Sequence, residues 1–397
     1  MPDMNPRAWH RKASRPVSIW MAVFLAVGLA HPFLPDGPWL LVHIFTLGIL
    51  TNSIVLWSQN LTERFLGRKL DSTARPAQLT RTYLLNAGAV AVLVGQPARW
   101  YWLTWVGALV VAVALAWHAV VLAGQVNAAP RKHAGVAGFV ASACCLPVGA
   151  LFGAALAAGL PGQWHGAVRQ AHMFTNVAGF VGLAAMGALS VLFPAMWRTR
   201  GQDRVGVALA LASAGVAVAV AGSLLRAPAV TGVGTVVILA GWVWLYQGFV
   251  ASALTVLRDP RGRVTYPALS ALCAVTWLIG GLAWYAVRVF AGTSDVPTLP
   301  LLLGFAAQLL IGTMSYLMPV TMGGGPAAVK AGLSQLNRAP YLRVGLFNAA
   351  LLAWLAVGNS YARIAFSFVA FGVLVAFIPL LARAVKAQVA VIKSRRP

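Results

Sequence analysis

Acidic side chains are scarce in this sequence of 397 residues, which has 7 Asp and Glu against 30 Lys and Arg. All seven fall in expected loops or at the ends of apolar stretches: Asp3, Asp36, Glu63, Asp71, Asp203, Asp259 and Asp295. Proton relays and cation-coupling sites inside a bilayer generally need a buried carboxylate. The sequence therefore argues against a proton- or sodium-driven transporter and against a proton-pumping enzyme.

Cysteine is also rare. Cys144, Cys145 and Cys273 all lie within apolar stretches, so no disulfide framework is predicted. Cys144 and Cys145 are adjacent, and adjacent residues point about 100° apart on a helix. We therefore interpret this pair as packing residues rather than as a metal site.

Long apolar stretches dominate what is present. Hydrophobic residues make up 60% of the chain and charged residues 9%, compared with roughly 25% charged in soluble domains. The strand-like alternation of a membrane β-barrel is absent, so helices are expected. We predict an all-α bundle of about twelve transmembrane helices, at 17–34, 39–59, 82–96, 100–123, 134–158, 165–194, 205–225, 229–256, 265–290, 299–321, 343–358 and 361–383.

The basic residues predict the orientation of these spans. With the N-terminus inside, 25 of the 30 Lys and Arg residues fall on the cytoplasmic side. We thus expect one membrane domain over 1–397, with cytoplasmic tails at 1–16 and 384–397. The basic residues are spread over seven short segments, which favours anionic lipids as partners and argues against nucleic acid.

An internal repeat links spans two, six and ten. Span six and span ten share six residues at a shift of 125: Gly179, Phe180, Gly187, Ser190, Leu192 and Pro194 match Gly304, Phe305, Gly312, Ser315, Leu317 and Pro319. Spans two and six share the phrase His-x-Phe-Thr, at His43 and at His172. Because these spans are four apart, we predict three pseudo-symmetric four-helix units.

His43 and His172 are the main site candidates. Both lie roughly 8–10 Å below the outer end of spans that run from outside to inside. An ionisable group in hydrocarbon generally faces a bundle interior or a cofactor, and neutral imidazole ligates heme iron or copper. The pair is expected to share one layer and bind heme, copper or both. The alternative is two separate core histidines, the interpretation preferred for His31, His118 and His165.

Other candidates are weaker. Arg169, three residues before His172, has the guanidinium needed to hold paired carboxylates such as heme propionates, or it snorkels to lipid headgroups. The methionines at 314, 318 and 322 fall on one helix face and suit Cu(I), although such a stripe is typical of core packing. Gly323–Gly325 followed by Pro326 predicts the end of span ten.

Three phrases, HIFTLGILTNSIVLWSQ, AHMFTNVAGFVGLAAMG and LLIGTMSYLMPVTMGGGPAA, resemble heme–copper oxidase subunit I. Within that superfamily the chain is similar to NnrS-type proteins and to the membrane N-terminal region of bacterial copper-oxidase-like proteins. The resemblance implies twelve helices in three arcs in a bacterial plasma membrane, and nitrogen-oxide or copper stress handling. His43 would match the span-two axial heme ligand, and His172 the span-six metal ligand.

The sequence departs from that family at two places. Span seven lacks a histidine pair, and span ten lacks any histidine, with Pro297 at the position that matches His172. A dinuclear oxygen-reduction centre is therefore not expected, and we do not expect an oxygen reductase. The alternatives are a multi-pass transporter, a membrane scaffold, or an anchor for a separate copper enzyme or electron-transfer partner.

Overall fold

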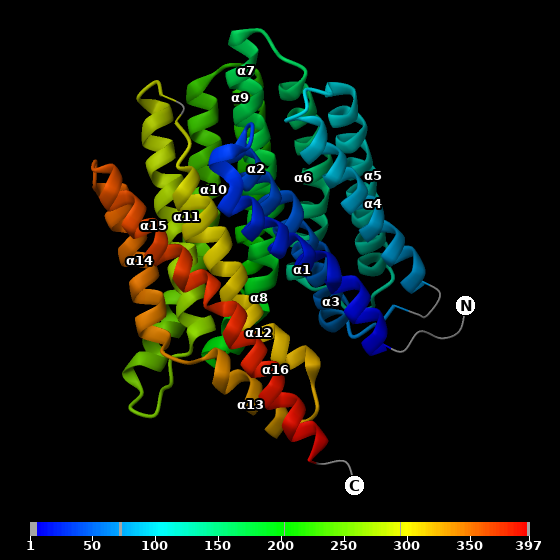
Figure 1. Cartoon of the computed structure of the whole chain (residues 1–397), viewed down its shortest axis with the longest axis vertical. Coiled ribbons are helices and arrows are strands. Elements are labelled where there is room, and N and C mark those ends of the chain that lie inside the picture. The colour runs from blue at the N-terminus through cyan, green and yellow to red at the C-terminus, as the bar shows by residue number, and fades with distance from the viewer. Residues whose placement is uncertain (1–5, 71–73, 202, 294, 395–397) are drawn as a thin grey trace. The chain divides into compact units, whose positions relative to one another are not determined.

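The structure is a computed structural model that describes residues 6–70, 74–201, 203–293 and 295–394 (Figure 1). These residues form helices, and none of them lies in a β-strand. The elements are α1 (Pro6–Ala30), η1 (His31–Phe33), α2 (Gly37–His43), η2 (Ile44–Leu50), α3 (Thr51–Phe65), α4 (Ala74–Gly95), α5 (Tyr101–Asn127), α6 (Ala134–Ala157), α7 (Gly162–Met173), η3 (Phe174–Gly182), α8 (Leu183–Trp197), α9 (Val205–Leu224), α10 (Pro228–Arg258), α11 (Tyr266–Phe290), η4 (Pro300–Ala307), α12 (Gln308–Met322), α13 (Pro326–Leu336), α14 (Pro340–Ala356), α15 (Ser360–Val375) and α16 (Phe377–Lys393). The prediction of an all-α fold is confirmed.

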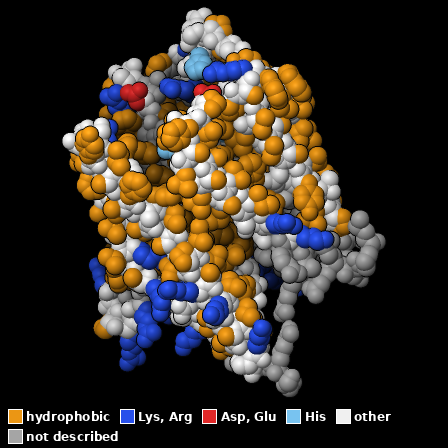
Figure 2. All heavy atoms as spheres, viewed as in Figure 1, with side chains coloured by type: hydrophobic (Ala, Val, Ile, Leu, Met, Phe, Trp, Pro, Cys, Tyr) orange, Lys and Arg blue, Asp and Glu red, His pale blue; other side chains and the backbone are white. Residues whose placement is uncertain are grey.

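Eleven helical stretches among the described residues are long and apolar enough to cross a membrane. They are Lys12–Phe33, Gly37–Phe65, Tyr101–Asn127, Ala134–Ala157, Gly162–Trp197, Val205–Leu224, Pro228–Arg258, Tyr266–Phe290, Pro300–Met322, Pro326–Ala356 and Ser360–Lys393. Hydrophobic side chains cover much of the visible surface (Figure 2), as lipid contact requires. The chain is a multi-pass membrane protein.

The predicted span at 82–96 is the one that is not among these eleven. It lies in α4, which has 22 residues and begins in a polar segment that contains Arg75, Gln78 and Arg81. The apolar part of α4 is therefore shorter than the roughly 20 residues that a bilayer-spanning helix needs.

Helix also extends into both predicted tails. α1 begins at Pro6 and α16 continues to Lys393, so most of 1–16 and 384–397 is helical and continuous with the adjacent apolar helix. Residues 1–5 and 395–397 lie outside the described residues. The side of the membrane on which the termini lie stays a prediction.

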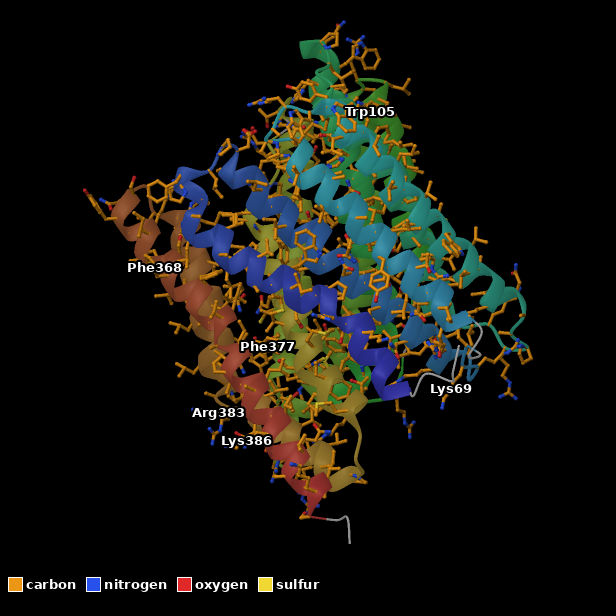
Figure 3. All side chains as sticks on the ribbon, turned by 45° about the vertical axis from the view of Figure 1, so that its right-hand side comes forward. Lys69, Trp105, Phe368, Phe377, Arg383 and Lys386 are labelled. Atoms are coloured by element: carbon orange, nitrogen blue, oxygen red, sulfur yellow. The ribbon has the colours of Figure 1, made fainter. Side chains whose placement is uncertain are left out.

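The chain divides into two compact units. The first comprises 1–188, 203–241 and 286–294, and the second comprises 189–202, 242–285 and 295–397. In the first unit α4, α5 and α6 lie side by side (Figure 1). Gly88 and Gly107 let α4 approach α5, because a Cβ on either would lie 2.7 Å from the backbone oxygen of the other. Exposed Trp105 lies near the start of α5, and Lys69 follows α3 at the opposite end (Figure 3).

In the second unit, a side chain from α16 caps the C-terminal end of α12. The α12 helix ends at Met322, and the three following glycines all have positive φ, between 65° and 89°. This agrees with the predicted end of span ten. The buried Gln388 Nε2 donates to the carbonyls of Pro319 at 2.9 Å and Gly323 at 2.7 Å, which satisfies groups that a helix end leaves unpaired. Arg383 and Lys386 lie further along α16 than Phe377 (Figure 3).

Three π-helical segments interrupt the long helices at matching places in the sequence repeat. They are η2, η3 and η4. A shift of 125 residues carries η3, Phe174–Gly182, onto positions 299–307, which coincide with η4, Pro300–Ala307, except for one residue. π-Helical segments are rare and occur often at functional sites. Their recurrence is a structural parallel between spans two, six and ten.

Each π-helical segment holds a glycine against a side chain from a neighbouring helix. A Cβ at Gly48 would lie 2.7 Å from Trp20, and one at Gly304 would lie 2.5 Å from Trp277. In η3, Gly179 faces Cys145 in the same manner. The two tryptophans also share a hydrogen-bond partner type, since Nε1 of each donates at 2.6 Å to the Oδ1 of an asparagine: Asn86 for Trp20 and Asn348 for Trp277.

Candidate functional site

His43 is the last residue of α2, immediately before η2 in the first unit. Its Nδ1–H donates to the backbone carbonyl of Trp39, one turn earlier, at 2.9 Å. The indole of Trp39 stacks on the imidazole, with ring centroids 4.0 Å apart and planes inclined by 22°. Because a carbonyl can only accept, the proton sits on Nδ1 and the lone pair on Nε2. Trp39 thus fixes both the orientation and the tautomer of His43.

His172 occupies the corresponding place near the end of α7, just before η3. Its Nδ1–H donates at 2.8 Å to the backbone carbonyl of Gly149 on α6. The Asn176 Nδ2 atom is 3.1 Å from Nδ1 and 3.3 Å from Nε2. An atom almost equidistant from both ring nitrogens cannot lie along the lone pair of Nε2, since the two nitrogens point to different sides of the ring. The Nε2 lone pair of His172 therefore has no well-aligned donor here.

Two glycines of α6 make room for this histidine. A Cβ at Gly153 would lie 2.9 Å from Cε1 of His172, and a Cβ at Gly149 would overlap the amide of Asn176. The two glycines thus leave room on the surface of α6 for the imidazole of His172. Beside it, Asn176 Oδ1 is a buried acceptor without a donor among the described residues.

The two imidazoles lie together. Their centroids are 6.5 Å apart and their planes are inclined by 29°. The threonines of the shared phrase also behave alike, since Thr46 Oγ1 donates to Val42 O at 2.8 Å and Thr175 Oγ1 donates to Ala171 O at 2.7 Å. The structure therefore brings together the two histidines that the sequence singled out, with matching local backbone.

This arrangement suits a metal held between two neutral imidazoles. Two imidazole rings that bind one metal ion through Nε2 from opposite sides have centroids roughly 6.3 Å apart, given metal–nitrogen bonds of about 2.0 Å. A hydrogen bond from Nδ1 to a backbone carbonyl is the usual support for a metal-binding histidine. In the part of the chain that the structure describes, no three His, Cys, Asp or Glu side chains cluster as a metal site. At this pair the described residues therefore offer two imidazole nitrogens and no carboxylate or thiolate.

The remaining candidates from the sequence lie elsewhere. Arg169 is exposed on α7, three residues before His172, and makes no hydrogen bond or ion pair with other described residues. His165 is exposed on the same helix, and His31 donates Nδ1–H to Gly28 O at 2.8 Å. His118 is buried beside Ser58 in a separate polar cluster.

The methionine stripe belongs to the second unit. Met314, Met318 and Met322 are half-buried along α12. Their roles as core or copper ligands stay open. The sequence analysis did not place Trp39, Gly149, Gly153 or Asn176 in the site.

Comparison with known protein families finds no family model that matches this chain. Comparison with curated proteins likewise finds no match. The resemblance drawn from short phrases therefore stays a prediction, and the chemistry of the site rests on the geometry of the histidine pair.

Proposed function

We propose that this protein binds heme or copper within the membrane through His43 and His172. The observation that carries the proposal is the pair of imidazoles 6.5 Å apart, each with Nδ1–H held by a backbone carbonyl. Both histidines come from apolar helices, where an ionisable group without a role is costly. A support that leaves both Nε2 lone pairs available is what a metal centre requires.

Heme fits the donor set better than a bare ion. Heme brings four nitrogen ligands of its own, so two histidines complete its iron, whereas copper at two nitrogens would lack further ligands from the described residues. Arg169, exposed one turn from His172, would pair with the heme propionates. When bound, the group would supply a redox-active iron; because the heme nitrogens and the two histidines would fill all six positions, the chemistry it would supply is electron transfer.

The recurrence of π-helical segments in spans two, six and ten supports three four-helix units. The twelve helices and the relationship to heme–copper oxidase subunit I are inferred from the resemblance, and the cytoplasmic termini from the distribution of basic residues. Pro297, at the position that matches His172, lies in a non-helical segment before η4 and offers no ligand. We therefore propose that this protein does not reduce oxygen. From the resemblance, we infer a role in nitrogen-oxide or copper stress handling at a bacterial plasma membrane.

The test is the visible absorption spectrum and metal content of protein purified in detergent from cells supplied with heme precursor and copper. We expect a Soret band with one iron per chain, lost in His43→Ala and His172→Ala but kept in His165→Ala. Bound copper in a protein that shows no Soret band would indicate that His43 and His172 bind copper rather than heme.

A colourless, metal-free wild type would overturn the proposal. The chain would then be a transporter or scaffold in which the histidines line a cavity or lock helices together. Co-purification of a copper enzyme with that metal-free protein would identify it as an anchor.

A further inference from the structure

The first unit contains a second group of buried polar side chains, on α3, α4 and α5. Arg81 is 3% exposed, His118 is 2% exposed and Thr62 is fully buried. His118 Nε2 lies 2.9 Å from Ser58 Oγ, which joins α5 to α3. The guanidinium carbon of Arg81 lies 5.4 Å from the ring centroid of Trp117, which joins α4 to α5.

The helix register places Arg81 level with His118. α4 and α5 run antiparallel, with Gly95 against Thr104 and Gly88 against Val111. Continuing this pairing along α4 brings position 81 opposite positions 117 and 118 of α5. The Trp117 contact agrees with that register, so the arginine and the histidine share one layer of the bundle.

This cluster holds many unpaired polar atoms. Buried atoms with no hydrogen-bond partner among the described residues are Arg81 Nε and Nη2, His118 Nδ1, Thr62 Oγ1, Gln125 Nε2 and Gln59 Oε1. Folded proteins leave few such groups, and each needs an explanation. Apart from the glutamine oxygen, these atoms are donors or can act as donors.

The positive charge of Arg81 is not balanced by the one acid nearby. Glu63 is engaged by Arg75, with contacts of 2.7 Å and 3.0 Å between the guanidinium nitrogens and the carboxylate oxygens. Gln59 Nε2 contacts the same carboxylate at 3.3 Å. Arginine stays protonated in proteins, and an unpaired buried charge is strongly unfavourable. The cluster therefore has one excess positive charge.

We propose that this cluster binds a small monovalent inorganic anion. The adjacent Nε and Nη2 donors of Arg81 form a fork that suits a planar oxyanion and also accommodates a halide. His118 Nδ1, when Nε2 accepts from Ser58, is the further donor that the helix register places level with Arg81. Thr62 Oγ1 and Gln125 Nε2 belong to the same group of buried polar atoms, nearer the ends of α3 and α5. One bound charge neutralises Arg81, which explains why the fold keeps an arginine there. The site is separate from the paired histidines and does not depend on the proposed function.

Thermal unfolding of the full chain in detergent tests the site, with chloride or nitrate replacing gluconate at constant ionic strength. The midpoint should rise by a few degrees and saturate, because a ligand of the folded state adds RT ln(1 + [L]/Kd) to stability. Arg81→Gln should abolish the rise, and exposed Arg131→Gln should keep it.

A direct readout covers the case in which Arg81→Gln does not fold. The ³⁵Cl NMR line of wild-type protein should broaden and should sharpen again when nitrate competes, and His118→Leu should weaken the effect at least threefold. A wild type with no saturable midpoint shift and no displaceable broadening would overturn the proposal and leave water as the partner. An unchanged anion response in folded Arg81→Gln would do the same.

Discussion

The backbone around η2 and η3 resembles that around η4, but the chemistry differs. All three segments are π-helical and hold a glycine against a side chain of another helix, at Gly48, Gly179 and Gly304. Only the first two are preceded by a histidine, whereas Pro297 precedes the third. The glycine-to-side-chain packing of η4 thus forms without a neighbouring imidazole. This difference argues that His43 and His172 serve a ligand rather than the fold.

The comparison predicts that removal of either histidine separates cofactor binding from stability. His43→Leu or His172→Leu should lose the bound metal completely. The metal-free proteins should unfold within about 1 °C of metal-free wild type, which is roughly 1 kcal/mol or less for a chain of this size. Metal analysis and thermal unfolding in detergent measure the two effects. A metal-free variant that fails to fold would mean that the imidazoles are core residues.

We expect a smaller loss of cofactor binding when His172 is kept but the space that its ring occupies is narrowed. In Gly153→Ala the new Cβ would lie 2.9 Å from Cε1 of His172, so the ring must move. Changes to the residues that support a metal ligand typically weaken metal binding 10–100-fold. Titration of the apo-protein with heme should reveal a loss of this size. Gly166→Ala on α7 is the matched control, since nothing lies within 4 Å of its Cβ, and an equal loss there would contradict the prediction.

Hydropathy predicted most of the fold, because spanning helices must be long and apolar. The prediction at 229–256 agrees closely with α10, Pro228–Arg258. The span at 82–96 was less well defined, since the polar residues Gln78 and Arg81 just before it are buried within the protein, which a hydropathy pattern cannot anticipate. The π-helical segments could not be predicted, because tertiary packing decides where one extra residue is accommodated.

The histidine pair was predictable because an ionisable residue and a repeated phrase coincide at equal depth. Trp39 was not, because a tryptophan near a helix start is also typical of the membrane interface. Gly149 and Gly153 were hidden for a similar reason, since glycine is common in membrane helices and only the position of the facing helix reveals which ones touch a site.

A test of the shared packing comes from the matching glycines. Gly48→Ala and Gly304→Ala should each destabilise the protein by about 1–3 kcal/mol, because the added Cβ overlaps Trp20 or Trp277. Both should lower the unfolding midpoint, whereas only Gly48→Ala should also alter the absorption spectrum, since it lies within η2 beside His43. A spectral change in Gly304→Ala would show that the two segments are not chemically distinct.

The smallest effect concerns the two tryptophan–asparagine pairs. Trp20→Phe and Trp277→Phe each remove one hydrogen bond, and hydrogen bonds between membrane helices contribute about 0.6 kcal/mol on average. We expect Trp277→Phe to cost more, because Asn86 Oδ1 keeps a second donor, Asn52 Nδ2 at 3.2 Å, whereas Trp277 is the only donor found for Asn348 Oδ1 among the described residues.

Denaturant unfolding of both variants beside wild type measures this difference. Equal losses would contradict the prediction and would indicate that a neighbouring amide replaces Trp277 as donor. The buried Gln308, which has no partner for Nε2 among the residues described, is the candidate for that replacement. It stands four residues after Gly304, as Asn52 stands four after Gly48. Gln308→Leu combined with Trp277→Phe would then restore the larger loss.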